Sequence, residues 1–392
     1  MKRKNSFRLF VVLLAFSLLF SSCASKPASA VAKDGWNTNY KYVFVHGLSG
    51  WGSYDFQNKF LKYWGMRGGD ALAYLNENGY DCYSASVDPY GSAWDRACEL
   101  YAQLTGSVVD YGLAHSSSCN HERFGTDYSD NPLIESWSAE DKINLIGHSF
   151  GGATIRLLAE LMANGSAEEI GATPADELSP LFTGGKGDWI YSITCLASPH
   201  NGTSAYNVND GTVDLSETLS FSERKMSDMV NSATAGSTDG RAETDYANYD
   251  LQIDNALVLN ERISTLQNVY YFSVPCCSTD LQQDGTYFPN REITEKMFVK
   301  SAILMGSRTG VTEGGFEFGE EWLPNDGLVN TVSATAPSNA PSVQFDESSV
   351  EAGVWNVMPV YAGDHMSLQG GMMIKNDVHG YFAQLLNMIN SI

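Results

Sequence analysis

A serine between two glycines, in the pentapeptide Gly-His-Ser-Phe-Gly at 147–151, constrains the fold more than any other stretch of this sequence. A mainly apolar run, 143–146, precedes it and an amphipathic run, 153–162, follows, so the pattern predicts a strand, a tight turn and a helix. In this context the turn is a nucleophile elbow, which lifts the hydroxyl of Ser149 above the edge of a sheet. The turn brings backbone segments close together and therefore needs glycines, and the helix N-terminus favours a developing negative charge. The alternative interpretation is a glycine-rich turn with an incidental serine.

Strands and helices alternate along the rest of the chain. Strands are expected at 42–45, 83–87, 189–196, 269–274 and 354–361, and helices at 69–76, 94–104, 256–266 and 378–389. This order predicts an α/β fold with a mostly parallel, doubly wound sheet. The stretch 204–243 is rich in Ser, Thr, Asp, Asn and Gly and contains one amphipathic piece, 215–230. We expect it to be an inserted lid, because long excursions from a compact domain are commonly functional.

The N-terminus has the pattern of a secretory leader. Residues 1–22 combine basic residues with an apolar run, Leu9–Phe20, that is too short for a spanning helix. Small residues before Cys23 look like a bacterial lipobox, which predicts a lipoprotein signal peptide and membrane attachment through a lipidated Cys23. Residues 23–38 then form a linker, and 39–392 form one catalytic domain. Ordinary cleavage nearby, with release into the medium, is the alternative.

Composition limits the possible partners. The 392 residues carry a formal net charge of −22, and such an acidic surface repels phosphate backbones, so no nucleic-acid partner is expected. Apolar residues make up 43% of the chain, which is enough for a sizeable core. Beyond Cys23 the cysteines show no Cys-x-x-Cys spacing, so neither a cysteine-based metal site nor a disulfide framework is indicated.

A serine nucleophile needs a base, and the base needs an acid that fixes its tautomer. In a fold of this type the acid and then the histidine follow the serine in sequence. His200 comes too early and His379 begins a helix, whereas His365 lies in a glycine-containing loop after an expected strand. Among many carboxylates, Asp326 is the best candidate for the acid, because Asn-Asp-Gly at 325–327 is a sharp turn ahead of an apolar, strand-like run.

Two backbone groups are candidate donors to a developing oxyanion. The expected strand at 42–45 leads into the glycine-rich segment 46–52, where the N–H of Leu48 is free to point at a substrate oxygen. The second donor is the N–H of Phe150, directly after the candidate nucleophile. Alone, the segment 46–52 would be interpreted as a glycine-rich loop. The serine elbow about 100 residues later favours the interpretation as part of an oxyanion hole.

His115 and His121 stand six residues apart among polar neighbours. By themselves they are most simply solvated loop residues. A metal site would need two further ligands from elsewhere in the chain, and carboxylates combined with neutral imidazoles suit Zn²⁺.

Together these motifs resemble the thermoalkalophilic bacterial lipase family, which comprises secreted α/β-hydrolases from Bacillus-like and staphylococcal sources. The resemblance covers most of 40–385 and is weakest in the lid and at 278–320. It rests on these segments: Val-His-Gly-Leu-Ser-Gly-Trp-Gly at 45–52, Trp-Asp-Arg-Ala-Cys-Glu-Leu-Tyr-Ala-Gln-Leu at 94–104, Val-Asp-Tyr-Gly at 109–112, Arg-Phe-Gly at 123–125 and Asn-Asp-Gly-Leu-Val-Asn-Thr-Val-Ser at 325–333. The resemblance implies a triad of Ser149, Asp326 and His365, with oxyanion-hole amides from Leu48 and Phe150.

The same resemblance implies a structural zinc ion. By motif its ligands fall on Asp95, His115, His121 and Asp245, and the ion should brace the base of the lid. Some family members also bind calcium through a Glu two residues after the catalytic histidine and through an Asp-Pro pair. Here Ser367 takes the first place and the second is surrounded by Gly-Met-Met at 371–373, which argues against Ca²⁺.

The expected function is that of a secreted serine ester hydrolase, a lipase or carboxylesterase acting on lipids or other esters through an acyl-enzyme. His200 and Asp245 are only 45 residues apart, so the lid is short and the site should be open. This favours an alternative within the class, a short-chain carboxylesterase or a hydrolase of polymeric esters. An alternative from another class is a non-catalytic surface-binding lipoprotein, against which the complete triad argues. Phe150 departs from the family's usual glutamine, and its ring is expected to line the acyl pocket.

Overall fold

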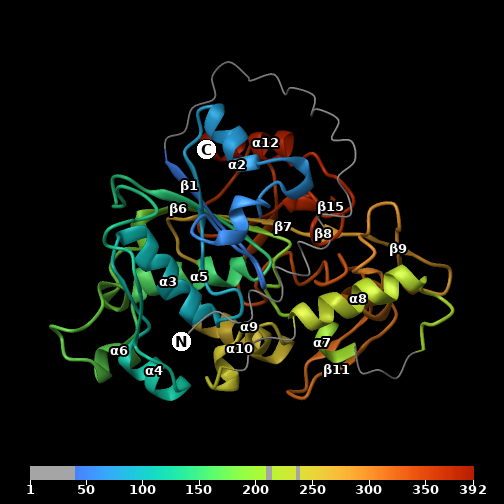
Figure 1. Ribbon diagram of the computed structural model, residues 1–392, viewed down its shortest axis with the longest axis horizontal. Helices are drawn as coiled ribbons and strands as arrows, with labels where there is room; N and C mark the ends of the chain where they lie inside the picture. The colour runs from blue at the N-terminus through green and yellow to red at the C-terminus, as the bar shows by residue number, and fades with distance from the viewer. Residues whose placement is uncertain (1–39, 209–213, 235–238) are drawn as a thin grey trace.

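Seven strands rich in β-branched and aromatic residues form one sheet through the middle of the computed structural model, which describes residues 40–208, 214–234 and 239–392 (Figure 1). The strands are β1 (Lys41–Val45), β2 (Cys82–Ala85), β5 (Ile143–His148), β6 (Ile190–Leu196), β7 (Tyr270–Val274), β13 (Ser342–Gln344) and β14 (Trp355–Val357). Their order is β13-β14-β7-β6-β5-β1-β2, and each neighbouring pair is parallel. The predicted α/β fold with a parallel sheet is confirmed.

Helices cover both faces of this sheet. Figure 1 shows α2 (Ala71–Glu77) and α12 (Val378–Asn390) on one side, and α3 (Ala93–Thr105) and α5 (Gly151–Asn164) on the other. Successive residues of a strand point to opposite faces, so β1 serves two cores. Tyr42 and Phe44 pack in the core with α12, and Val43 and Val45 pack in the core with α3 and α5. The elbow at the end of β5 is therefore held by a sheet that is buried on both faces.

Helix ends follow from capping residues in the sequence. The carboxylate of Asp70 accepts the N–H of Ala73 at 3.0 Å, which starts α2 at the predicted place. The hydroxyl of Ser92 accepts the N–H of Asp95 at 3.2 Å at the start of α3, and Gly106 ends that helix with φ of 62°.

Several predicted boundaries differ from the structure. The strands expected at 83–87 and 354–361 are shorter, and α10 (Ile253–Arg262) begins earlier than expected. The apolar run after Asp326 was expected to be strand-like and is instead a series of turns. The reason is local, because the Asp326 carboxylate accepts the N–H groups of Leu328 and Val329 and folds the chain back on itself.

The remaining helices and strands are short, except for the 14-residue helix α8. The helices are α4 (Leu113–Cys119), α6 (Ala167–Ala172), α7 (Ala205–Val208), α8 (Phe221–Thr234), α9 (Ala247–Asp250) and α11 (Val299–Gly306). Single 3₁₀ turns are η1 (Phe56–Lys59), η2 (Met66–Gly68), η3 (Pro180–Thr183), η4 (Gly187–Trp189), η5 (Glu243–Asp245), η6 (Glu320–Trp322) and η7 (Ser367–Gln369). Two-stranded sheets pair β3 (Val108–Asp110) with β4 (Phe124–Asp127), β8 (Cys276–Cys277) with β15 (Tyr361–Ala362), β9 (Thr279–Leu281) with β10 (Tyr287–Pro289), and β11 (Gly310–Val311) with β12 (Glu317–Phe318).

The segment predicted as a lid, 204–243, contributes α7 and α8 within the described part of the chain. Leu219 packs against Val299 and Ile303 of α11, and Met226 packs against Met297 and Phe298. The described part of this segment thus lies against α11 and the turn that precedes it. Figure 1 labels α8. Its role as a lid stays a prediction.

The predicted signal peptide at 1–22, the linker at 23–38 and the lipidated Cys23 lie outside the described residues. Among the residues that are described, no helix is both long and apolar enough to cross a bilayer. The six described cysteines are free thiols.

Candidate active site and metal cluster

The elbow is a sharp turn between the end of β5 and the start of α5. Ser149 has φ of 54°, a left-handed conformation that is rare for a residue with a side chain. A Cβ atom on Gly147 would lie 2.6 Å from the backbone of Gly151, and one on Gly151 would lie 2.3 Å from the carbonyl oxygen of Val45. Both glycines are therefore required by close backbone contacts, as the sequence pattern indicated.

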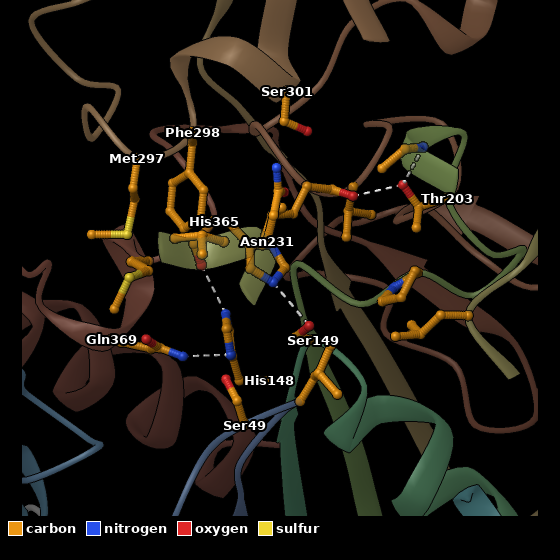
Figure 2. A pocket seen from close by; sticks show the side chains of 18 of the residues that line it. Ser49, His148, Ser149, Thr203, Asn231, Met297, Phe298, Ser301, His365 and Gln369 are labelled. Atoms are coloured by element: carbon orange, nitrogen blue, oxygen red, sulfur yellow. Dashed lines mark hydrogen bonds between the residues drawn. The ribbon is translucent and has the colours of Figure 1, made fainter. Parts of the chain in front are cut away.

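Three side chains from remote segments meet at this turn. His365 Nε2 lies 2.8 Å from the hydroxyl oxygen of Ser149, and His365 Nδ1 lies 2.8 Å from Asp326 Oδ2 (Figure 2 shows the contact between Ser149 and His365). A carboxylate oxygen only accepts hydrogen bonds, so the proton of the neutral ring is on Nδ1. The lone pair on Nε2 then faces the Ser149 hydroxyl, the arrangement in which a histidine can take the serine proton.

The acid and base loops are also joined through the backbone. Asp326 is 1% exposed, and its second oxygen accepts the N–H groups of Leu328 at 3.0 Å and Val329 at 2.7 Å. The His365 N–H donates to the Asp326 carbonyl oxygen at 2.9 Å. Gly327, with φ of 97°, passes so close to Phe298 that a Cβ there would lie 2.6 Å from the Phe298 Cβ. These contacts hold the imidazole in one orientation.

The two other histidines that follow Ser149 in sequence do not contact it. His200 is buried, with Arg156 Nη1 3.4 Å from its Nδ1, and burial followed by the Arg156 charge lowers its pKa well below 6.5. His379 stacks on Tyr74 with ring centroids 4.6 Å apart, in the first turn of α12.

Two backbone N–H groups are the candidate donors to an oxyanion. Within the described ranges, neither the N–H of Leu48 nor that of Phe150 has a protein acceptor. Leu48 lines the same cavity as Ser149.

The expectation that the Phe150 ring lines the acyl pocket is wrong. Phe150 is 1% exposed and lies in the core, with the Arg96 guanidinium carbon 5.1 Å from the centroid of the Phe150 ring. Residue 150 follows the turn into α5, which directs its side chain away from the cavity.

Arg96 is a buried residue that sequence reasoning missed. Its guanidinium donates to the carbonyl oxygens of His46 and Asp88 and to the hydroxyl of Thr154. Burial, and then the charge of Arg96, lowers the pKa of His46 to about 3. Arg96 thus ties α5 to the end of β1, the segment that carries Leu48. The available signal was an arginine on the apolar face of the predicted helix at 94–104.

The catalytic candidates open into an apolar cavity of about 430 Å³. Its lining includes Ser149 and His365 together with methionines from several elements, namely Met66, Met226, Met229, Met297, Met366 and Met372. Figure 2 shows Met297 and Phe298 on one side of His365 and Ser149 below it. Methionine is unbranched and polarisable, so these walls can adapt to different apolar groups.

A buried carboxylate supports one wall of this cavity. Glu295 Oε1 accepts the N–H groups of Met372 at 2.8 Å and Ile374 at 2.9 Å, and also that of Met373. The Glu295 N–H donates to Asp364, whose pKa burial raises to about 7. Since Asp364 precedes His365, Glu295 joins the Met372 turn to the loop of the candidate base.

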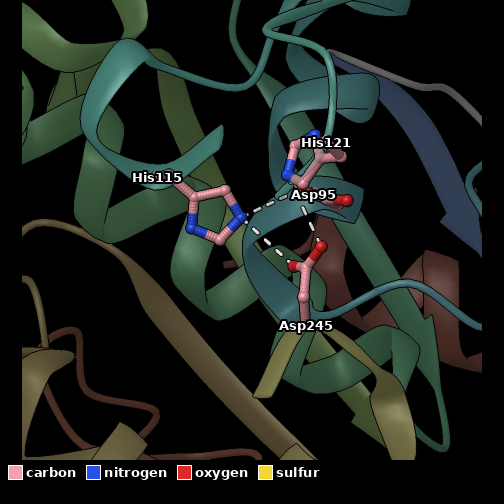
Figure 3. A group of neighbouring side chains, drawn as sticks. All are labelled: Asp95, His115, His121 and Asp245. Carbon is pink, nitrogen blue, oxygen red and sulfur yellow. Dashed lines mark hydrogen bonds and ion pairs between the residues drawn. The ribbon is translucent and has the colours of Figure 1, made fainter. Parts of the chain in front are cut away.

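A second group of polar side chains gathers at 95, 115, 121 and 245, outside the cavity (Figure 3). His115 Nε2 lies 3.1 Å from Asp95 Oδ1 and 3.1 Å from Asp245 Oδ1. His121 Nε2 lies 3.7 Å from Asp95 and 3.5 Å from Asp245. The ligand atoms of all four residues lie within 4.8 Å of one another.

The donor set of this cluster fits a metal ion. Asp245 Oδ2 and His121 Nε2 are both buried and have no hydrogen-bond partner in the described structure. His121 Nδ1 lies 2.8 Å from the carbonyl oxygen of Glu122, which places its proton on Nδ1 and leaves the Nε2 lone pair free. Burial opposes a charge on His115, but hydrogen bonds to Asp245 and Asp95 outweigh it and raise the pKa of His115 to about 9. Arg241 already places one positive charge beside the two carboxylates, 3.0 Å from Asp95 and 3.9 Å from Asp245. A bound cation would add to it.

Comparison with known proteins identifies the family. The model of the family described as lipase-like, C-terminal domain matches residues 38–236 and 238–379. The chain belongs to this family. Lipase 2 of Staphylococcus aureus is 34% identical over 358 residues, which cover 84% of this chain and 50% of that protein. The chain thus spans about half the length of the curated relatives that it matches.

Solved structures of similar proteins share the fold. EstA from Clostridium botulinum aligns with a TM-score of 0.78 and 28% identity, covering 100% of this chain and 99% of that one. Lipase 1 from Pelosinus fermentans aligns with a TM-score of 0.72 and 32% identity, covering 90% of this chain and 99% of that one. The resemblance drawn from the sequence motifs is confirmed at the level of family and fold.

Proposed function

We propose that this protein is a serine ester hydrolase. The observation that carries the proposal is the continuous hydrogen-bonded series from Asp326 through His365 to Ser149, which opens into an apolar cavity. This is the arrangement needed for acyl transfer to a serine. Family membership and the names of the relatives favour the same activity.

In the first half of the reaction, His365 Nε2 takes the proton of Ser149 as the hydroxyl oxygen attacks the ester carbonyl carbon. The N–H groups of Leu48 and Phe150 donate to the resulting oxyanion, an interaction worth roughly 3–4 kcal/mol per donor. His365 then gives its proton to the leaving alcohol as the carbon–oxygen bond breaks. The Asp326 carboxylate stabilises the transient imidazolium.

In the second half, His365 takes a proton from water as the water oxygen attacks the acyl-enzyme. The tetrahedral intermediate collapses, the carboxylic acid leaves, and the proton returns to Ser149 through His365. The helix N-terminus of α5 beside Ser149 favours the oxyanion in both steps.

The substrates proposed are lipids and other esters with an apolar acyl group. The methionine-rich walls support this, as does the absence of Asp, Glu, Lys and Arg among the described residues that line the cavity. A short-chain carboxylesterase or a hydrolase of polymeric esters are variants of the same proposal, and the short segment between His200 and Asp245 favours them.

Zn²⁺ is the proposed occupant of the metal cluster. Two imidazoles and two carboxylates are a donor set that suits zinc in a closed, four-coordinate site. Asp95, His115, His121 and Asp245 would hold the ion, and none of them lines the cavity that contains Ser149. The proposed role is structural, because the ligands join α3, α4 and η5.

We propose further that the protein is exported and lipid-anchored through Cys23. The support is the leader pattern at 1–22 with a cysteine directly after small residues. The strongly acidic composition suits a soluble domain outside the cell.

Replacement of the nucleophile tests the activity. Ser149→Ala should lower kcat on p-nitrophenyl esters by at least about 10⁴-fold, because no acyl-enzyme can form. A fluorophosphonate probe should label the wild-type serine and not this variant. Ser301→Ala, a serine that lines the same cavity, serves as the control and should keep labelling and turnover. An unlabelled wild-type protein would instead support a non-catalytic binding lipoprotein.

A substrate series tests the acyl preference. Initial rates on tributyrin, triolein and an aliphatic–aromatic polyester film should be highest on tributyrin, with measurable film hydrolysis, if the site is open. A much higher rate on emulsified triolein, with a jump at the solubility limit, would contradict the open-site proposal and favour a long-chain lipase.

Removal of one carboxylate tests the metal site. Asp245→Ala should reduce zinc from about one ion per chain to a trace in elemental analysis and lower the unfolding midpoint, because the closed four-ligand site loses one of its two carboxylates. Asp239→Ala, an exposed carboxylate in the adjoining segment, is the control and should retain zinc. Full zinc occupancy in the Asp245 variant would refute the ligand assignment.

The mature N-terminus tests the anchor. Mass spectrometry should find a lipid-modified Cys23 as the first residue, and Cys23→Ser should shift the protein from the membrane fraction. An unmodified terminus beyond residue 23 would exclude lipid anchoring.

A further inference from the structure

His148, the residue before Ser149, has no role in the mechanism above. It is 1% exposed, and its two ring nitrogens contact different segments around the site. Its Nε2 lies 2.8 Å from the carbonyl oxygen of His365. Its Nδ1 lies 2.8 Å from the Tyr63 hydroxyl and 2.6 Å from Gln369 Nε2. Figure 2 shows the imidazole between His365 and Gln369, with both contacts drawn.

The partners determine the tautomer of His148. A carbonyl oxygen only accepts, so the ring must carry its proton on Nε2 and donate it to His365. Nδ1 is then an acceptor, and its single lone pair faces two donors, the amide N–H of Gln369 and the hydroxyl of Tyr63. Burial, followed by the charge that His365 can carry, lowers the pKa of His148 well below 6.5, so the ring stays neutral.

Tyr63 extends this series to the segment of the candidate oxyanion hole. The Gly47 N–H donates to the Tyr63 oxygen at 2.9 Å, and the Tyr63 hydroxyl proton is therefore available to His148 Nδ1. Gly47 directly precedes Leu48. One directional series of hydrogen bonds thus connects the end of β1, the elbow at the end of β5 and the loop of the base.

We propose that His148 is a positioning residue, which fixes the backbone of His365 and so sets its Nε2 in line with the Ser149 hydroxyl. The inference rests on the proposed ester hydrolase function and adds a residue that acts through His365. A carbonyl oxygen at this buried place has to be satisfied by a donor, and the elbow supplies one from the residue adjacent to the nucleophile. His148 and Ser149 belong to the same turn. That turn therefore sets the distance from His365 Nε2 to the Ser149 hydroxyl.

The chemistry explains why a neutral imidazole suits this place better than a cation. The ring centroids of His148 and His365 are 4.9 Å apart. When His365 takes the serine proton it becomes positive, and a second charge at this distance in a buried site would oppose that step. A histidine held neutral donates to the carbonyl oxygen without adding a charge.

Two amide substitutions separate the two ring nitrogens. The side-chain amide of His148→Gln reaches the position of Nε2 and can still donate to the His365 carbonyl oxygen, whereas that of His148→Asn reaches only the position of Nδ1. We expect His148→Asn to lower kcat on a p-nitrophenyl ester about 30-fold with KM within about twofold. His148→Gln should keep kcat within about threefold of wild type.

The controls distinguish this inference from the activity itself. Wild-type turnover that is lost in Ser149→Ala must first be established, so that an inactive wild type counts against the proposed function and not against His148. Ser192→Ala removes a buried hydrogen bond to Asn144 in the same sheet and should lower the unfolding midpoint without changing kcat. Equal kcat in the Gln and Asn variants, at any level, would overturn the proposal.

Tyr63→Phe keeps the test decisive if the His148 variants do not fold. It removes the donor to Nδ1 and leaves the Gly47 N–H without its acceptor, so kcat should fall about fivefold with little change in KM. A kcat equal to that of wild type would contradict the proposed series.

Discussion

The close approach of three backbone segments at the elbow is the constraint on which the rest of the site depends. Ser149 takes a left-handed conformation that costs roughly 1–3 kcal/mol for such a residue and persists only where the surroundings enforce it. Here the Ser149 N–H donates to Leu196 of β6 at 2.9 Å, while Gly151 passes over the carbonyl oxygen of Val45 in β1. The strain is therefore held by the two strands that flank β5. A sheet buried on both faces gives them little freedom to move.

Beyond the carboxyl ends of the seven strands, the backbone ladder of the described residues shrinks to the short pair β8 and β15. Buried polar side chains then take over much of the hydrogen bonding. Arg96 satisfies the carbonyl oxygens of His46 and Asp88, and Glu295 satisfies three N–H groups of the turn at 372–374. Arg96 joins the loop after β1 to α3, and Glu295 joins the turn at 372–374 to the loop that carries His365. The loops that carry the chemistry are consequently rigid without belonging to the sheet.

The sequence could predict those parts of the structure that are marked by a local residue pattern or by the order of residues along the chain. Alternating strands and helices predicted the parallel sheet, and the order of serine, acid and histidine selected Asp326 and His365 from many candidates. The full set of metal ligands could be identified only through the family resemblance. Asp95 and Asp245 are far apart in sequence, and neither belongs to a recognisable metal-ligand spacing.

The features that sequence could not predict depend on tertiary contacts. The Phe150 ring was expected in the cavity and lies in the core, because the direction of its side chain depends on how α5 leaves the turn. Glu295 gave no signal, since its partners belong to a turn almost 80 residues later. The segment after Asp326 looked like a strand by its apolar residues, but carboxylate hydrogen bonds in the turn decided its shape.

The segment 204–243 runs between the cavity that contains Ser149 and the metal cluster, and different interactions hold its two ends. At its start, the Thr203 hydroxyl donates to the carbonyl oxygen of Leu328 at 2.6 Å, and the Ser204 N–H donates to the side chain of Asn330 at 2.9 Å, both in the acid loop. At its end, Arg241 lies 3.0 Å from Asp95 of the metal cluster.

A motion of this segment that widens the cavity would therefore occur between these anchors, in the part that carries α7 and α8. A metal ion at the cluster would add its bonds only to the second anchor, because Thr203 and Ser204 do not touch the cluster in the described structure. The contacts among Ser149, His365 and Asp326 involve neither the lid segment nor the cluster. Metal loss should thus act first on substrate access and on the stability of the domain, and only indirectly on the proton transfer itself.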